Sequence, residues 1–188
     1  MKKIWIVLGI VIVIALMLFS WYRNGYNQAI AKDEEVKAAW AQVDNQLQRR
    51  NDLIPNLVST VKGFAAQEKG VFTEVTKLRS QWSQAGTIES KIDNANQMSA
   101  ALSRLLLVSE NYPELKSNEN FLTLQAQLEG TENRIAVERM RYNNAVKDFN
   151  RFQRLFFGRF FASQAGVDKP AVYFEAEKVA SGVPAVNF

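Results

Sequence analysis

The stretch Ile4–Tyr22, which reads IWIVLGIVIVIALMLFSWY, decides how the rest of the chain is organised. None of its nineteen residues is charged. A helix of this length rises roughly 28 Å, at about 1.5 Å per residue, which matches the hydrocarbon core of a bilayer. Trp5, Trp21 and Tyr22 stand at its two ends, where aromatic rings favour the membrane interface. The stretch therefore predicts a transmembrane helix.

Charges on the two sides of this stretch predict its orientation. Lys2, Lys3 and the α-amine precede it, whereas Arg23 follows it and an acidic run begins at Asp33. Positive charge near a membrane span is retained in the cytoplasm. We therefore expect a single pass through the cytoplasmic (inner) membrane, with the N-terminus in the cytoplasm and the body on the extracytoplasmic, periplasmic side.

A cleaved signal peptide is the alternative to a retained anchor. The apolar core of such a peptide usually spans about 7–15 residues, with small residues close behind it. Here the apolar run is longer, and the first Ala-x-Ala motif after it, at 29–31, lies beyond Arg23. The chain has no cysteine to carry a lipid. We expect the anchor to be retained and the bilayer to be its partner.

The composition of the body disfavours several classes of function. Without Lys2, Lys3 and Arg23, 20 basic residues balance 19 acidic ones, so nucleic acid is not an expected partner. The absence of histidine and cysteine removes the commonest general base, the commonest metal ligand and all thiolate sites. Ser59-x-x-Lys62 matches an acyl-enzyme motif, but no Lys-Ser/Thr-Gly element follows it and nothing predicts the α/β scaffold that the motif needs. We expect no catalytic residue, cofactor or metal, and no enzyme activity.

Hydrophobic periodicity predicts four amphipathic helices in the body. Their apolar stripes run over 36–47, 54–75, 88–106 and 121–156, and Ser117 is the expected cap of the last one. No strand-like alternation is present. The pattern predicts an all-α fold, in which the N-terminal transmembrane helix is followed by an antiparallel up-and-down four-helix bundle.

Turn-forming residues set the expected boundaries. Residues 51–56, which contain Pro55, predict a tight reversal, with a kinked continuous helix as the alternative. Gly86 followed by Thr87 predicts a helix end and a new N-cap, and Pro113 ends the third helix. Gly25 is expected to loosen the joint between anchor and body. We expect three segments, which are the anchor over 1–25, the bundle over 26–157 and a mostly irregular tail over 158–188.

Several motifs resemble those of the LemA family of bacterial envelope proteins. They are RRNDLIPNLV at 49–58, VKGFA at 61–65, ENYPELK at 110–116, RYN at 141–143, FN at 149–150, YFEA at 173–176 and VPAVNF at 183–188. The chain departs from the family at Gln67, where a histidine is frequent, and after Phe157, where Phe-Pro is frequent. The resemblance implies a membrane-tethered four-helix bundle with no established enzymatic activity.

Reversals at Pro55 and Pro113 would bring the segments 49–56 and 111–116 together at the far tip of the bundle. The expected result is an exposed patch that docks envelope or membrane proteins, made of Arg49, Arg50, Asp52, Asn56, Tyr112 and Lys116. The alternative is that these motifs serve only the turns.

Small residues form a second candidate surface on the predicted second helix. Their spacings of 4, 3, 4 and 3 place them in one stripe, made of Ser59, Gly63, Ala66, Gly70 and Thr73. Glycine inside a helix costs about 1 kcal/mol relative to alanine. The stripe predicts close approach of another helix, in a homo-oligomer or a partner, and the alternative is a helix stable enough to tolerate two glycines.

The segment FNRFQRLFFGRFF at 149–161 combines phenylalanines with three arginines. If the fourth helix returns to the membrane, this segment reaches the headgroup region, which suits aromatic rings and guanidinium groups. The residues assigned to the membrane surface are Phe157, Arg159, Phe160 and Phe161. The alternative is that the rings close the end of the bundle and carry the tail.

These observations favour a non-enzymatic, single-pass envelope protein whose helical body is a scaffold or adaptor for other proteins. The alternative function is a membrane-remodelling or lipid-contacting module that acts through residues 149–161.

Overall fold

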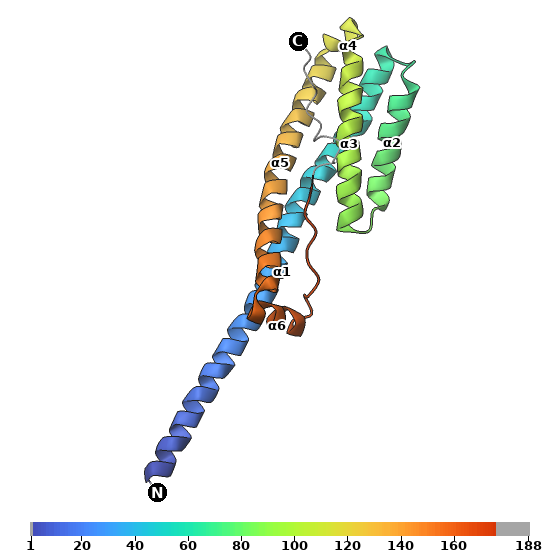
Figure 1. Cartoon of the computed structure of the whole chain (residues 1–188). Coiled ribbons are helices and arrows are strands. Elements are labelled where there is room, and N and C mark those ends of the chain that lie inside the picture. The colour runs from blue at the N-terminus through green and yellow to red at the C-terminus, as the bar shows by residue number, and fades with distance from the viewer. Residues whose placement is uncertain (1, 176–188) are drawn as a thin grey trace, which may run out of the picture. The chain divides into compact units, whose positions relative to one another are not determined.

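The computed structural model describes residues 2–175, and every regular element among them is a helix (Figure 1). The helices are α1 (Lys2–Phe64), α2 (Lys69–Gln84), α3 (Ile88–Ser109), α4 (Pro113–Lys116), α5 (Glu119–Arg154) and α6 (Phe156–Gln164). The predicted all-α class is confirmed. Internal contacts divide the chain into a first unit, Met1–Trp40 with Tyr142–Ala171, and a second unit, Ala41–Arg141 with Val172–Phe188.

Helix α1 passes through Pro55 without ending. Proline has no N–H to donate to the carbonyl oxygen four residues earlier, which belongs to Asn51. That oxygen instead accepts a hydrogen bond from Nε of Arg79 in α2, at 3.3 Å. The expected reversal at 51–56 is therefore wrong and the continuous helix is correct, because a side chain from another helix replaces the missing donor.

The chain leaves α1 only after Phe64, so the predicted second helix is divided. Its first part completes α1, and its second part is α2. The next boundary is as expected, because the hydroxyl of Thr87 accepts a hydrogen bond from the backbone N–H of Ser90 at 3.2 Å. The Ser90 hydroxyl accepts one from the N–H of Thr87 in return, which completes a capping box.

The cap of α5 is Asn118 rather than Ser117. The side-chain oxygen of Asn118 accepts a hydrogen bond from the N–H of Phe121 at 3.0 Å, whereas Ser117 closes the short helix α4. Pro113 opens α4, where its missing N–H costs no helical hydrogen bond. The sequence prediction overlooked α4 and therefore placed the cap one residue too early.

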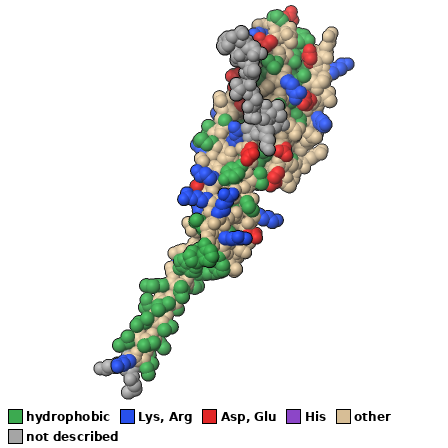
Figure 2. All heavy atoms as spheres, viewed as in Figure 1, with side chains coloured by type: hydrophobic (Ala, Val, Ile, Leu, Met, Phe, Trp, Pro, Cys, Tyr) green, Lys and Arg blue, Asp and Glu red, His purple; other side chains and the backbone are tan. Residues whose placement is uncertain are grey.

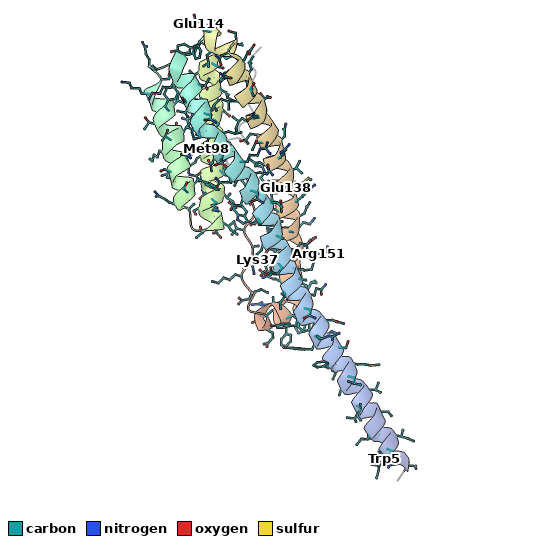
Figure 3. The ribbon with its side chains drawn as sticks, turned by 180° about the vertical axis from the view of Figure 1, so that it is seen from behind. Trp5, Lys37, Met98, Glu114, Glu138 and Arg151 are labelled. Carbon is teal, nitrogen blue, oxygen red and sulfur yellow. The ribbon has the colours of Figure 1, made fainter. Side chains whose placement is uncertain are left out.

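A hydrophobic core in the second unit is formed by residues of α1, α2, α3, α4 and α5. Met98, labelled in Figure 3, is fully buried in it. The core consists of Ile54, Leu57, Val61, Ala65, Phe72, Val75, Leu78, Met98, Ala101, Leu102, Leu105, Val108, Leu115, Phe121 and Leu128. Each large side chain buried there contributes about 1.5–3 kcal/mol. Most of these residues lie on the apolar stripes that the sequence predicts.

The segment from Gly158 onward is more regular than expected, because α6 extends to Gln164. The chain turns from α5 into α6 at Leu155. A Cβ atom at Gly158 would collide with the carbonyl oxygen of Phe152, so this turn requires glycine. Residues 165–175 contain no helix, and the rest of the expected tail, with the motif at 183–188, lies outside the described residues.

Candidate membrane-surface site

The apolar stretch of α1 is exposed along its whole length. Its large side chains from Ile4 to Phe19 are each half or more exposed, and Figure 2 shows them as a continuous apolar surface. Trp5 lies near the free end of α1, away from any other helix of the first unit (Figure 3). Within the described residues, α1 is the one helix long and apolar enough to cross a membrane.

Helix α6 packs against the end of this stretch through aromatic rings. The centroid of the Phe161 ring lies 5.0 Å from that of Trp21 and 5.9 Å from that of Tyr22. The Phe157 ring meets Trp21 edge-on at 5.2 Å. A Cβ atom at Gly25 would overlap the Phe161 ring. Gly25 therefore does not interrupt α1 as expected, but allows the ring to approach the helix backbone.

The other aromatic rings of α6 are exposed. Phe156 is 85% exposed, and Phe157 and Phe160 are about half exposed. Phe161, which the sequence analysis assigned to the membrane surface, is only 3% exposed. That assignment is wrong because this ring is enclosed between α6 and α1, whereas Phe157, Arg159 and Phe160 are exposed as expected.

Phe156 is the most exposed ring of the segment, and the sequence analysis did not select it. It lies four residues before Phe160, so both rings project from one side of a helix. The spacing of Phe156 and Phe160 could have identified Phe156 from the sequence. The sequence analysis did not use this spacing, because it expected no helix beyond Gly158.

A groove of about 1170 Å³ lies between α1, α5 and α6 in the first unit. Trp21, Phe152, Phe156 and Phe157 are among its apolar lining residues, and Lys32, Asp148 and Arg151 are charged ones. Arg151 is labelled on α5 in Figure 3. Among the described residues, no ion pair engages Lys32, Arg151, Arg154 or Arg159. The groove thus combines aromatic walls with two cations, Lys32 and Arg151, that form no ion pair within the part of the chain that the structure describes.

The predicted docking patch contains one residue that is not exposed at all. Arg50 is 1% exposed, and its guanidinium donates hydrogen bonds to Oγ of Ser99 at 2.9 Å, to the carbonyl of Ala95 at 3.1 Å and to Oε1 of Glu132 at 3.1 Å. Burial lowers the pKa of Arg50, and the Glu132 carboxylate opposes that shift. The expectation of an exposed Arg50 is wrong, because it joins α1 to α3 and α5.

The other predicted docking residues do not form a loop patch. Arg49, Asp52 and Asn56 are exposed along α1, which continues beyond them to Phe64. Tyr112 is half-buried against the core, and Lys116 is exposed and pairs with Glu110 at 2.6 Å. Because residues 49–56 are helical, the meeting of two loops on which the patch was based does not occur.

The stripe of small residues is also divided between two helices. Ser59 and Gly63 belong to α1, Ala66 to the connection, and Gly70 and Thr73 to α2. All five are exposed, and a Cβ atom at either glycine would meet no atom within 4 Å. The continuous track is therefore wrong because α1 ends at Phe64, and self-association stays an untested prediction.

Comparison with known proteins identifies the family. The profile of the LemA family matches residues 39–188. Two proteins of Paramagnetospirillum magneticum, magnetosome protein MamQ 1 and magnetosome protein MamQ 2, are each 27% identical over 207 residues, covering 96% of this chain and 74% of the relative. Protein LemA of Metamycoplasma hominis is 21% identical over 150 residues, covering 79% of this chain and 68% of the relative. The resemblance seen in the motifs is thus confirmed, and the chain belongs to the LemA family.

Proposed function

We propose that this protein is a non-enzymatic, single-pass protein of the bacterial cytoplasmic membrane, and that its extracytoplasmic body is a scaffold or adaptor for envelope or membrane proteins. The proposal includes an antiparallel four-helix bundle made by α1, α2, α3 and α5. The observation that supports the proposal is the exposed apolar stretch of α1. The same helix continues into residues that form the core of the second unit. An anchor and a folded body thus share one helix.

The polar groups inside the second unit support a structural function. Arg50 donates to groups of α3 and α5, and Nδ2 of Asn94 donates to the carbonyl of Leu78 at 2.9 Å. Within residues 2–175, no group of three acidic side chains is placed to hold a metal ion. These buried groups connect helices, and we assign them no chemistry.

Exposed leucines on the second unit are the best position for a protein partner. Leu107 is 65% exposed and Leu122 about half exposed, and both line a groove of about 560 Å³ beside the Glu110–Lys116 ion pair. Apolar side chains rimmed by charged ones are typical of protein-docking surfaces. This surface replaces the tip patch expected from the sequence.

Cysteine labelling in intact cells tests the topology, because the chain has no cysteine of its own. A membrane-impermeant maleimide should label Ser80→Cys in the exposed face of α2, but should label a cysteine inserted after Met1 only after lysis. Alkaline carbonate should leave the chain in the membrane pellet. Release by carbonate, or the reverse labelling pattern, contradicts the proposal.

Site-specific crosslinking tests the adaptor function. A photo-crosslinking residue at Leu122 should give a discrete adduct with another envelope protein, whereas the same residue at Ser80 should not. Leu107→Glu should reduce the Leu122 adduct, because a carboxylate beside the groove disfavours apolar docking. Equal adducts from both positions, or an adduct unaffected by Leu107→Glu, would count against this surface.

A second function, contact with the membrane surface through residues 149–161, is favoured by α6. This helix is fixed to the end of the apolar stretch by Phe161 and still leaves Phe156 and Phe160 exposed.

A further inference from the structure

We propose that α6 and the groove beside it bind the headgroups of anionic phospholipids in the leaflet that surrounds the anchor. The inference rests on the proposed membrane attachment and names the ligand of the membrane-contacting segment. It is carried by three features of the first unit, which are the level of α6, the exposed rings of α6, and cations of α1, α5 and α6 that form no ion pair within residues 2–175.

The aromatic contacts set the level of α6 relative to the membrane. Trp21 and Tyr22 end the apolar stretch, and they lie in the headgroup region when that stretch fills the hydrocarbon core. Phe157 and Phe161 pack directly on Trp21. Helix α6 therefore lies at the depth of the headgroups and the first acyl carbons.

The exposed rings suit that depth. Phe156 and Phe160 are exposed to the surroundings, and Phe157 is about half exposed beside its contact with Trp21. In water such a cluster is unfavourable, but in the interfacial plane shallowly inserted rings are stabilised by contact with acyl chains.

The cations supply specificity for negative charge. Arg151, Arg154 and Arg159 follow one another through the segment, and 149–161 contains no acidic residue. In the groove, Lys32 and Arg151 outnumber the single carboxylate, Asp148.

Two of the three carboxylates in the acidic run at 33–35 are already paired. Asp33 and Glu34 both bind Lys37, at 2.7 and 2.8 Å, and their hydrogen bonds raise the pKa of Lys37. Lys37 thus forms an ion pair with both carboxylates. Guanidinium groups bind phosphate oxygens through paired, charge-assisted hydrogen bonds, which favours a phosphate ligand at the free arginines.

A phospholipid would contact both the exposed rings and the cations, whereas each of two other occupants would contact only one of these groups. Free phosphate would engage Arg151 and Lys32 but would leave the rings in water. An apolar helix of a second copy would cover the rings but would leave the cations unpaired. The headgroup and acyl chain of one lipid meet the cations and the rings together.

Depth-dependent fluorescence on the full chain tests this inference. Ser163→Cys is exposed on the side of α6 that carries Phe156 and Phe160, so an NBD label there keeps every ring in place. The labelled chain is reconstituted into vesicles of phosphatidylcholine, alone or mixed with phosphatidylglycerol. Lipids brominated near the headgroup end of the acyl chain are the quencher. The same label at Ser80→Cys is the control position.

We expect lipid quenching at Ser163→Cys to increase in the anionic vesicles and to be absent at Ser80→Cys. Replacing the three arginines of 149–161 by glutamine should remove the increase, with a loss of about fivefold in the docked-to-undocked ratio per arginine at low salt. Arg49, Lys77 and Arg134, all exposed in the second unit, give a matched loss of charge when changed to glutamine and should leave quenching unchanged. Phe156→Ser with Phe160→Ser should abolish quenching in both vesicle types.

Each remaining outcome overturns the inference. Equal quenching in neutral and anionic vesicles excludes the anionic headgroup. Relief of quenching by inorganic phosphate, beyond that by chloride at equal ionic strength, assigns the cations to a free anion instead. A chain that floats with vesicles but shows no quenching at Ser163→Cys defeats this inference and leaves the anchor standing, whereas a chain that does not float defeats both.

Discussion

The two units differ in what they bury. In the second unit the charged side chain of Arg50 is buried, and aliphatic side chains from five helices are enclosed. In the first unit aromatic rings hold α6 to α1, while other rings and cations stay exposed. The second unit therefore encloses the large apolar side chains of its core and holds the guanidinium of Arg50 by hydrogen bonds to α3 and α5. The first unit leaves apolar and charged groups whose natural counterparts are acyl chains and phosphate. The contrast suggests one region built to fold and one built to meet a membrane.

Arg50→Ala should cause the largest loss of stability among the variants that test this contrast. It removes a buried guanidinium that joins three helices and leaves the carbonyl of Ala95 without that donor, so we expect a loss of about 3 kcal/mol in the free energy of unfolding. Urea unfolding of the full chain in detergent, followed by circular dichroism, measures it. Arg49→Ala is the matched control, because this neighbour is exposed and should change stability by less than about 0.5 kcal/mol.

If the two arginine variants unfold at the same urea concentration, the second unit does not depend on its buried polar group. The two units would then differ only in their packing, which uses aliphatic side chains in the second unit and aromatic rings in the first.

Gly158→Ala should have the next largest effect, and it should be confined to the first unit. The new methyl group would collide with the carbonyl oxygen of Phe152, so α6 must move away from its contact with Trp21, at a cost of about 2 kcal/mol. Hydrogen exchange of residues 156–164 should become faster, while exchange in α3 should not change.

Gly130→Ala is the matched glycine control. A Cβ atom there meets no atom within 4 Å, and the position lies inside α5, so alanine should stabilise the chain by up to about 1 kcal/mol. Unchanged exchange over 156–164 in Gly158→Ala would show that the turn into α6 tolerates a side chain, against the packing described above.

A double-mutant cycle at Pro55 and Arg79 should give the smallest effect. Arg79→Ala removes the donor to the carbonyl of Asn51 and should cost about 1 kcal/mol. In a Pro55→Ala background the helix supplies its own N–H, so the same change should cost only a few tenths of a kcal/mol. Equal costs in the two backgrounds would mean that Arg79 does not compensate for the proline.

The sequence predicted the features that depend on neighbouring residues. The hydrophobic stripes of α3 and α5 predicted most of their buried faces, and Gly86 with Thr87 predicted the start of α3. For the candidate site, the composition of 149–161 led to the prediction of a membrane surface, which stays a prediction, but did not show which rings are exposed.

The sequence predictions were wrong where a residue distant in the chain overrides the conformation that the neighbouring residues favour. Pro55 strongly predicts a helix end, because it cannot donate a hydrogen bond to the carbonyl of Asn51. Arg79 in α2 donates to that carbonyl instead. The docking patch depended on that reversal and was therefore misplaced, whereas the small-residue stripe failed because the helix ends at Phe64. Phe161 has the same composition signal as Phe160, and only the approach of α1 at Gly25 separates the buried ring from the exposed one.

By itself, the sequence determined that this chain is helical, that it carries one exposed apolar stretch, and where capping residues start α3, because these features follow from hydrophobic period and side-chain chemistry within a few positions. Only the tertiary structure decided that α1 continues through Pro55, that Arg50 is buried and that α6 lies against Trp21, because each depends on a hydrogen bond or a ring contact between residues far apart in the chain.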